Sequence, residues 1–422
     1  RRPLAVVRAV DVADVRLAVA AAREFGLDLA IRAGGHSVPG FGTVDDGIVL
    51  DLSAMKGTRI DPERRVARVQ AGCTWGDFDH AAHAFGLATT GGIISSTGVS
   101  GLTMGGGIGY LTRAHGLSID NLRSADVVLA DGSFVTADEN EHADLFWALR
   151  GGGGNFGVVT EMEFDLHPVD TIYGGPMFFE LDVAEELFTV YREWIKAAPR
   201  AMGAFPAFQI APPLPFIPEN RVGEPLALLV SCFNGSDEEG ESLLAALRDV
   251  GTPVAEHVGR MPYPALNSAF DGLLPAGLQH YWKAAFLTEL SDGAIAAHLE
   301  HGPKVPAVES TMHMYPIDGA VHDVAGDATA FAYREANFAP VIAGMWPDPA
   351  DNEANIRWVR DYHQALEPHS SAGGYVNFMA EDDQSRIVVN YGANYDRLAA
   401  IKRAYDPGNL LHLNQNITPA AS

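Results

Sequence analysis

Basic residues are scarce in this sequence. Its 422 residues include 29 Lys and Arg against 54 Asp and Glu, which gives a formal net charge of -25. We expect no nucleic-acid partner, because binding to a phosphate backbone depends on clustered positive charge. The acidic side chains are expected to form a hydrated surface instead.

Cysteine is scarcer still, since only Cys73 and Cys232 occur. They allow one disulfide, but two cysteines so far apart in the sequence do not make a disulfide framework. Cys73 lies at the end of an expected strand, and we expect it to be a buried packing residue. No group of Cys and His has the spacing of a zinc site, so no metal is expected.

Long apolar runs are absent as well. No stretch is long enough to span a bilayer, and no membrane partner is expected. The first residues, Arg1-Arg2-Pro3-Leu4, do not resemble a signal peptide and look like the middle of a domain. We therefore expect a cytoplasmic protein whose natural N-terminus lies outside this sequence.

The spacing of apolar residues predicts mixed helices and strands in the first 170 residues. Residues 11–26 repeat apolar side chains every three or four positions, as one face of a helix does. A second helix is expected to begin after Thr74, whose hydroxyl can cap its first turn. Asp131-Gly132 separates two apolar runs and predicts a β-hairpin over 125–136. Further strands are expected at 29–31, 48–50, 66–69 and 158–166, and a short helix at 145–149.

Glycine is concentrated in three loops, at 34–35, 91–109 and 151–154. The longest of them holds eight glycines, too many for the interior of a helix or strand. Without a Cβ the backbone can approach a ligand closely, and its N–H groups can converge on an anion. Tight turns packed against one another would also use glycine, so one loop alone decides little. Three such loops in one domain predict a large ligand with a diphosphate, but neither the Rossmann nor the Walker pattern is present.

The chain is too long for one compact core. After residue 170 glycine becomes less frequent, proline-rich breaks such as 212–215 occur, and 226–230 is a clear strand. We expect an α+β protein of two domains. The first covers 1–170, the second covers 171–375 with an antiparallel sheet backed by helices, and the segment 376–422 returns to the first domain.

Four segments resemble, in order, the vanillyl-alcohol-oxidase-type flavoproteins. Residues 31–40, Ile-Arg-Ala-Gly-Gly-His-Ser-Val-Pro-Gly, are similar to the pyrophosphate loop of that family. Residues 96–109 and 153–160 are similar to its second and third flavin loops, and 391–417 to its C-terminal segment. The match is closest to the berberine-bridge-enzyme-like branch. The resemblance implies that family's two-domain fold, with FAD between the first domain and the substrate domain.

The resemblance also implies covalent FAD. In this family the His of the Gly-Gly-His-Ser loop, here His36, bonds to the 8α-methyl carbon of the flavin. Many relatives make a second bond from a Cys, but the matching position is Ile94, which predicts a single bond, as in relatives that oxidise 6-hydroxynicotine. The residues implied to bind FAD are Arg32, Ala33, Gly34, Gly35, His36, Ser37, Ser96, Thr97, Val99, Gly101, Leu102, Gly105, Gly106, Gly107, Gly109, Gly154, Asn155, Gly157, Val158, Val159, Asn414 and Asn416.

The resemblance identifies the catalytic residues less directly than the FAD-binding residues. Relatives with two bonds carry Tyr-x-Asn-Tyr near the flavin, with the last Tyr as a base. Tyr375 and Asn377 match this motif, but Phe378 replaces the last Tyr and has no proton to exchange. We expect Tyr375, Asn377 and Lys283 as catalytic residues. His313, Arg334 and Glu381 are further candidates, and for each a surface or core role stays open.

The resemblance implies an FAD-linked oxidase, in which hydride passes from a substrate C–H to flavin N5 and O2 reoxidises the flavin to give H2O2. A dehydrogenase with another acceptor stays open, because Thr97 at the oxygen gate of plant relatives does not separate the two. A flavin-binding protein without turnover stays open as well. Alcohols, sugars, amines and secondary metabolites all fit as small-molecule substrates, and Phe205, Phe208 and Trp282 favour an apolar pocket only weakly. We expect a monomer or a homodimer.

Overall fold

The first part of the chain contains a sheet of three strands and a sheet of five, besides one short strand pair. The computed structural model describes residues 1–421. Strands β1 (Ala5–Arg8), β3 (Ile48–Asp51) and β2 (Leu29–Arg32) make a parallel sheet in that order. Helix α1 (Val12–Phe25) packs on it, and it forms where predicted because Asp11 caps its first turn and Gly26 ends it with φ +62°.

The second sheet is antiparallel, in the order β4 (Thr58–Asp61), β5 (Val66–Gln70), β9 (Val158–Asp165), β7 (Leu122–Val128) and β8 (Phe134–Asp138). The predicted hairpin is confirmed, with Gly132 at φ +85° between β7 and β8. The helix predicted after Thr74 is also confirmed, as α2 (Trp75–His83). Thr74 and Asp77 cap each other there, as in a capping box.

The glycine-rich stretch 91–109 is not all loop, and in this respect the prediction is wrong. Helix α3 (Val99–Met104) lies inside it. Gly98 and Gly105 stand at the two ends of this helix, and only Gly101 lies within it. The glycines therefore mark its limits rather than fill it. The same half of the chain contains α4 (Thr112–His115), α5 (Ala143–Leu149) and the short pair β6 (Leu87–Ala88) and β10 (His167–Pro168).

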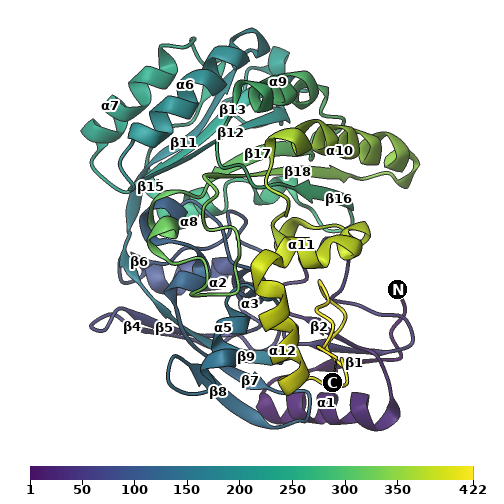
Figure 1. The fold of residues 1–422 in the computed structure, drawn as a ribbon. Coiled ribbons are helices and arrows are strands. Elements are labelled where there is room, and N and C mark those ends of the chain that lie inside the picture. Colours follow the sequence, from purple (N-terminus) through teal and green to yellow (C-terminus); the bar gives the residue numbers. More distant parts are fainter. Residues whose placement is uncertain (422) are drawn as a thin grey trace.

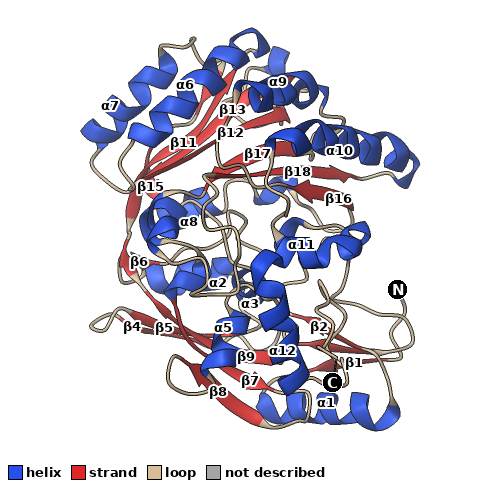
Figure 2. Ribbon diagram, in the orientation of Figure 1, coloured by secondary structure: helices blue, strands red, loops and turns tan. Residues whose placement is uncertain are grey.

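An eight-stranded antiparallel sheet follows, as predicted for the second half of the α+β fold. Its path is β14 (Ala255–Glu256), β11 (Thr171–Phe179), β13 (Pro225–Phe233), β12 (Met202–Ile210), β17 (Thr311–Pro316), β18 (Phe338–Trp346) and β16 (Gln279–Ala284), with β15 (Gly259–Pro262) beside β11. Helices α6 (Ala184–Ala197), α7 (Asp237–Arg248), α9 (Asp292–His301) and α10 (Asn352–Leu366) lie on its outer face (Figures 1 and 2).

The two faces of this sheet carry different side chains, because successive residues of a strand point to opposite sides. On β12, Ala204 and Phe208 pack in the core beneath the helices, whereas Phe205 and Ala207 belong to the core on the inner face. The inner face looks toward the first half of the chain. Helix α8 (Tyr263–Asn267) lies between the two halves, against α2.

The last segment crosses back to the first half. Helix α11 (Ile387–Tyr391) is followed by α12 (Tyr395–Tyr405), drawn in yellow in Figure 1. Leu398 and Ile401 of α12 share a core with Leu145 and Phe156. Domain limits at residues 170 and 375 stay a prediction.

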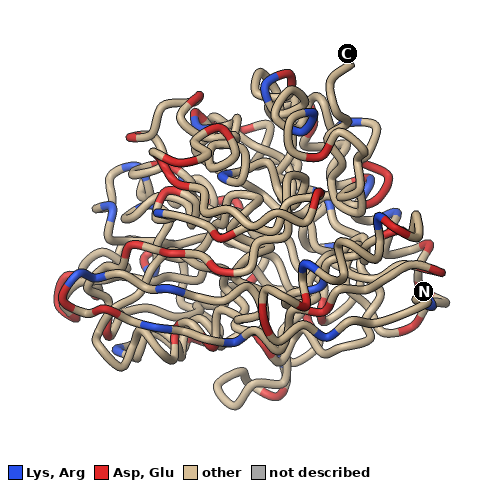
Figure 3. The backbone as a smooth tube through the Cα atoms, turned by 90° about the horizontal axis from the view of Figure 1, so that it is seen from below, with Lys and Arg blue, Asp and Glu red and all other residues tan. Residues whose placement is uncertain are grey.

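Both cysteines are buried and free, so no disulfide joins them. Cys73 is fully buried and belongs to the core around Trp75, as predicted. Among residues 1–421 no helix has the length and apolar character needed to cross a membrane. Figure 3 shows acidic residues on many segments, with Lys and Arg dispersed among them.

Asp79 makes the stability of this fold depend on pH. It lies on α2 with 4% of its surface exposed, and its carboxyl group accepts a hydrogen bond of 2.7 Å from Asn267 of α8. Burial raises the pKa of Asp79 to about 7, and the bond from Asn267 opposes this only partly. Since an unfolded Asp has a pKa of about 4, the free energy of unfolding should fall as the pH rises from about 4 to 7.

We expect Asp79→Asn to remove most of this dependence. Three pKa units correspond to at most about 4 kcal/mol, so the wild type should lose a measurable part of that between about pH 5 and 8, and the variant much less. Urea unfolding of both proteins at the two pH values measures the difference. Equal losses in the two proteins would contradict the assignment.

Candidate active site

A cavity of about 360 Å³ lies between the glycine loops and the inner face of the large sheet. Its floor comes from the loop after β2, the loop before α3 and the start of β9. Its opposite wall comes from β12, β13, β16, β17 and β18. The C-terminal segment closes one side with Leu411, Leu413 and Asn414. Three stretches that are far apart in the sequence therefore meet around one space.

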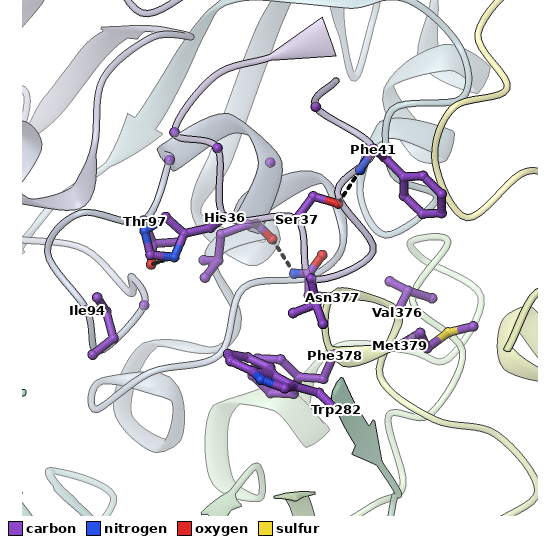
Figure 4. Close-up of a pocket in the computed structure, with 18 of the residues that line it drawn as sticks. His36, Ser37, Phe41, Ile94, Thr97, Trp282, Val376, Asn377, Phe378 and Met379 are labelled. Atoms are coloured by element: carbon purple, nitrogen blue, oxygen red, sulfur yellow. Dashed lines mark hydrogen bonds between the residues drawn. The ribbon is translucent and has the colours of Figure 1, made fainter. Parts of the chain in front are cut away.

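His36 lies on the floor of this cavity, in the loop that follows β2 (Figure 4). Its Nε2 is 2.9 Å from Ser96 Oγ, and its Nδ1 is 3.4 Å from Thr97 Oγ1. Partial desolvation by the cavity walls lowers the pKa of His36, and the nearby Asp271 raises it in part. The imidazole is thus neutral near pH 7 and keeps a lone pair that can act as a nucleophile.

The glycines around His36 leave room for a ligand. A Cβ on Gly101 or Gly154 would meet no atom within 4 Å, and both residues line the cavity. Gly34 and Gly98 lie so close together that a Cβ on Gly34 would be 2.3 Å from the nitrogen of Gly98. The two loops therefore form a continuous surface, which side chains would have blocked.

Unpartnered polar atoms also indicate that the cavity holds a ligand. The Oδ1 atom of Asn414, which lines the cavity, is buried and has no hydrogen-bond partner in the described chain, and the same holds for Oδ1 of Asn416, two residues further on. Buried polar atoms without partners are rare, and those at a cavity are commonly satisfied by a ligand. FAD fits a cavity that is bordered by glycine loops and has unpartnered amide oxygens beside it.

Comparison with known proteins agrees with this geometry. Residues 3–138 match the family model described as an FAD binding domain, and residues 374–418 match the model "Berberine and berberine like". An FAD-linked oxidoreductase of Dictyostelium discoideum is 32% identical over 99% of this chain and 89% of its own length. The chain belongs to the berberine-bridge-enzyme-like family of FAD-linked oxidoreductases.

Two other relatives are informative. The (R)-6-hydroxynicotine oxidase of Paenarthrobacter nicotinovorans is 31% identical, over all of this chain and 92% of its own. A crystal structure of 6-hydroxy-D-nicotine oxidase from Arthrobacter nicotinovorans superimposes with a TM-score of 0.86 at 26% identity, covering 100% of this chain and 93% of that one. This FAD-linked oxidoreductase thus has the two-part fold expected from its sequence.

Most residues predicted to bind FAD lie at the cavity. Those that line it are Arg32, Ala33, Gly34, Gly35, His36, Ser37, Thr97, Gly101, Leu102, Gly154, Asn155, Gly157, Val158, Val159 and Asn414. Ser96 does not line it but contacts His36. Val99 is buried in the core. Asn416 lies outside the lining, with its Oδ1 unpartnered and its N–H donating to Gln384 Oε1 at 3.5 Å.

Gly105, Gly106, Gly107 and Gly109 do not line the cavity. A Cβ on Gly107 would be 2.1 Å from Ser118 Oγ, and one on Gly109 would be 1.7 Å from the carbonyl oxygen of Gly91. These glycines allow the chain to pack against itself. Their role in binding FAD stays a prediction.

Tyr375 and Asn377 support the loop after α3. The Tyr375 hydroxyl accepts hydrogen bonds of 2.8 Å from Gly107 N–H and from Asn377 Nδ2, which also donates to the carbonyl oxygen of Leu102. Burial raises the pKa of Tyr375 to about 12. Asn377 lines the cavity, whereas Tyr375 lies behind it. The structure therefore places Tyr375 as a support for the loop, and its catalytic role stays a prediction.

Lys283 lies outside the cavity, contrary to the position expected of a catalytic residue. Its ammonium group is 2.9 Å from Asp382 and 2.5 Å from Asp383. Desolvation lowers its pKa, but these two carboxylates outweigh it and the pKa is raised. A paired, protonated lysine cannot accept a proton from a substrate. Arg334 likewise pairs with Asp120 away from the cavity.

The sheet side of the cavity carries polar side chains that the sequence-based prediction largely missed. Every second residue from 309 to 315 lines it, namely Glu309, Thr311, His313 and Tyr315, together with Gln209. The alternation of these side chains at every second position, into and along β17, is the sequence signal that could have identified them. His313 Nε2 is 2.9 Å from the Tyr315 hydroxyl. Trp282 and Phe378 stand side by side on the same wall, with ring centroids 5.7 Å apart (Figure 4).

We expect Gly154→Val to lower the amount of FAD bound without unfolding the protein. The added side chain would project into the cavity rather than into the chain. The ratio of flavin absorbance to protein, with thermal unfolding of the same sample, measures both effects. Gly259→Val is the matched control, because a Cβ there also meets nothing but lies on β15, outside the cavity. Equal flavin content in the two variants would contradict the assignment of the cavity.

Proposed function

We propose that this protein is an oxidase of small organic molecules whose FAD is attached through His36 alone. The main support for this proposal is that the neutral imidazole of His36 lies at the cavity floor. Ile94 lines the same space and has no thiol for a second bond. Attachment would join a His36 nitrogen to the 8α carbon, each losing one hydrogen, with the two electrons passing through the flavin to dioxygen.

Bound FAD supplies the hydride acceptor of the reaction and a route for electrons to dioxygen, which becomes hydrogen peroxide. The chain would hold it with Arg32 and the N–H groups of the glycine loops at the phosphates, and with Asn414 and Asn416 at free polar groups. Trp282 and Phe378 would exclude water from the reacting carbon. Asn377 lines the cavity and matches the asparagine of the Tyr-x-Asn-Tyr motif, and we propose it as a catalytic residue.

The pair formed by Tyr315 and His313 gives the cavity a neutral hydrogen-bonding group. Burial raises the pKa of Tyr315 and lowers that of His313 to about 3. Both are uncharged at neutral pH, so Tyr315 would bond to a hydroxyl or an amine of the substrate and orient its C–H bond.

The charged side chains that line the cavity limit the charge of the substrate that it can bind. Glu309 is the one carboxylate among the described lining residues, and the sheet side of the cavity has no Lys or Arg among residues 1–421. Phe205, Leu228 and Val230 make the rest apolar. We propose a neutral or cationic substrate with an apolar body. The oxidation of 6-hydroxynicotine, named for one relative, is consistent with this class.

His36→Ala tests the attachment. When the wild type is precipitated with acid, yellow flavin should stay in the protein pellet, and in the variant it should all be released into the supernatant. Both proteins should bind FAD before precipitation, because the remaining lining residues are unchanged. Flavin that stays in the pellet of the variant would refute a bond through His36.

Anaerobic reduction followed by air tests the oxidase. A panel of neutral and cationic alcohols and amines should include a compound that bleaches the flavin without oxygen. Rapid return of the colour in air, with peroxide formed, is the expected result. Slow return would favour a dehydrogenase, which Thr97 at the cavity also allows.

Tyr315→Phe should lower kcat/KM for the substrate found in that panel. Loss of one hydrogen bond of about 1–1.5 kcal/mol corresponds to a decrease of about five- to twelvefold. The flavin content should not change. An unaltered kcat/KM would show that Tyr315 does not contact the substrate.

A further inference from the structure

The loop that faces His36 is held from two sides. On one side, the first N–H groups of α2 bind its carbonyl oxygens: Trp75 N–H donates to Thr97 at 2.9 Å, and Gly76 N–H donates to Ser95 at 2.8 Å. These bonds leave the N–H and the hydroxyl of Ser95 free to bind elsewhere.

Asp271 binds the other side of this loop. Its Oδ1 accepts a hydrogen bond of 2.9 Å from Ser95 N–H, and its Oδ2 accepts a short bond from Ser95 Oγ. Asp271 begins the 3-10 turn η4 (Asp271–Leu273), which lies 176 residues further along the chain, between α8 and β16. One carboxylate thus joins the floor of the cavity to the segment between α8 and β16.

The same turn forms part of the cavity. Phe270, Leu273 and Leu274 line it, and they flank Asp271. The position of this wall and the position of Ser95 are therefore coupled through one side chain. Bonds to an ionised acceptor are stronger than neutral ones, so this contact is a firm link.

The link extends to His36 through the next two residues. Ser96 Oγ contacts His36 Nε2 at 2.9 Å, and Thr97 Oγ1 lies 3.4 Å from Nδ1. Ser96 and Thr97 follow Ser95 directly, so the bonds that hold Ser95 limit where these two residues can lie. Ile94, on the other side of Ser95, offers the loop no covalent anchor.

We propose that Asp271 is a positioning residue for the covalent attachment of FAD: through Ser95 it holds Ser96 and Thr97 where they orient the His36 ring. This inference rests on the proposed attachment through His36. Asp271 does not touch the attachment site itself. Without it, the protein should still bind FAD in the cavity but should bond fewer molecules of it.

Asp271→Asn and Ser95→Ala test the proposal. In the first variant the amide oxygen can still accept from Ser95 N–H, but its nitrogen cannot accept from the hydroxyl. In the second variant the hydroxyl is absent and the carboxylate remains. We measure total flavin per protein, the fraction that stays with acid-precipitated protein, and the thermal unfolding of each holoenzyme.

In both variants the covalent fraction should fall several-fold while total flavin changes little. Ser95→Thr restores a hydroxyl and should recover most of the covalent fraction. Asp323→Asn is the matched control, because this carboxylate pairs with Arg200 at the surface and should leave the fraction as in the wild type.

An unchanged covalent fraction in Asp271→Asn and Ser95→Ala would overturn the proposal. So would a parallel loss of total flavin and of thermal stability with the covalent fraction unchanged, since that pattern indicates general support of the fold. Failure of the proposed attachment looks different, because the wild type itself would then release its flavin in acid.

Discussion

The buried ion pair between Lys402 and Asp406 is the interaction on which the shape of the cavity depends. Neither side chain is more than 1% exposed. Lys402 Nζ also donates to the carbonyl oxygens of Asn155 and Leu411, and Asp406 accepts from the N–H groups of Leu410 and Leu411. Removing one partner would leave a buried charge and destabilise the protein by about 3–5 kcal/mol. The bond from Lys402 to Asn155 joins the C-terminal segment to the end of the third glycine loop.

Two further buried arginines join the halves of the molecule. Arg113 of α4 pairs with Asp318 and donates to the carbonyl oxygens of Ile195 and Met202 in the second half. Arg334 donates from its two terminal nitrogens to the two carboxylate oxygens of Asp120. Paired guanidinium groups with fixed geometry resist sliding of one half over the other. These contacts join the parts of the chain on either side of the cavity.

Features set by neighbouring residues could be predicted from the sequence, and features set by distant partners could not. The cap at Thr74 and the hairpin at Asp131-Gly132 depend on a few adjacent residues, and both are confirmed. Lys283 looked available for catalysis because its partners, Asp382 and Asp383, lie about a hundred residues away. Glycine density has the same limit. It shows where a Cβ is excluded, but not whether a ligand, as at Gly154, or another part of the chain, as at Gly107, fills the space.

Phe378, which stands where the motif has a tyrosine, packs against Tyr315 of β17. The rings of Phe378 and Tyr315 are stacked, with centroids 6.3 Å apart and planes at 17°. Tyr315 therefore provides a phenol hydroxyl beside the position where the motif has lost one, and His313 fixes the direction of that hydroxyl. Because burial keeps both groups neutral, this arrangement suits hydrogen bonding to a neutral group better than removal of a proton. If the proposed oxidase function holds, such a cavity would suit substrates whose C–H bond can be broken without a strong base, such as a neutral amine.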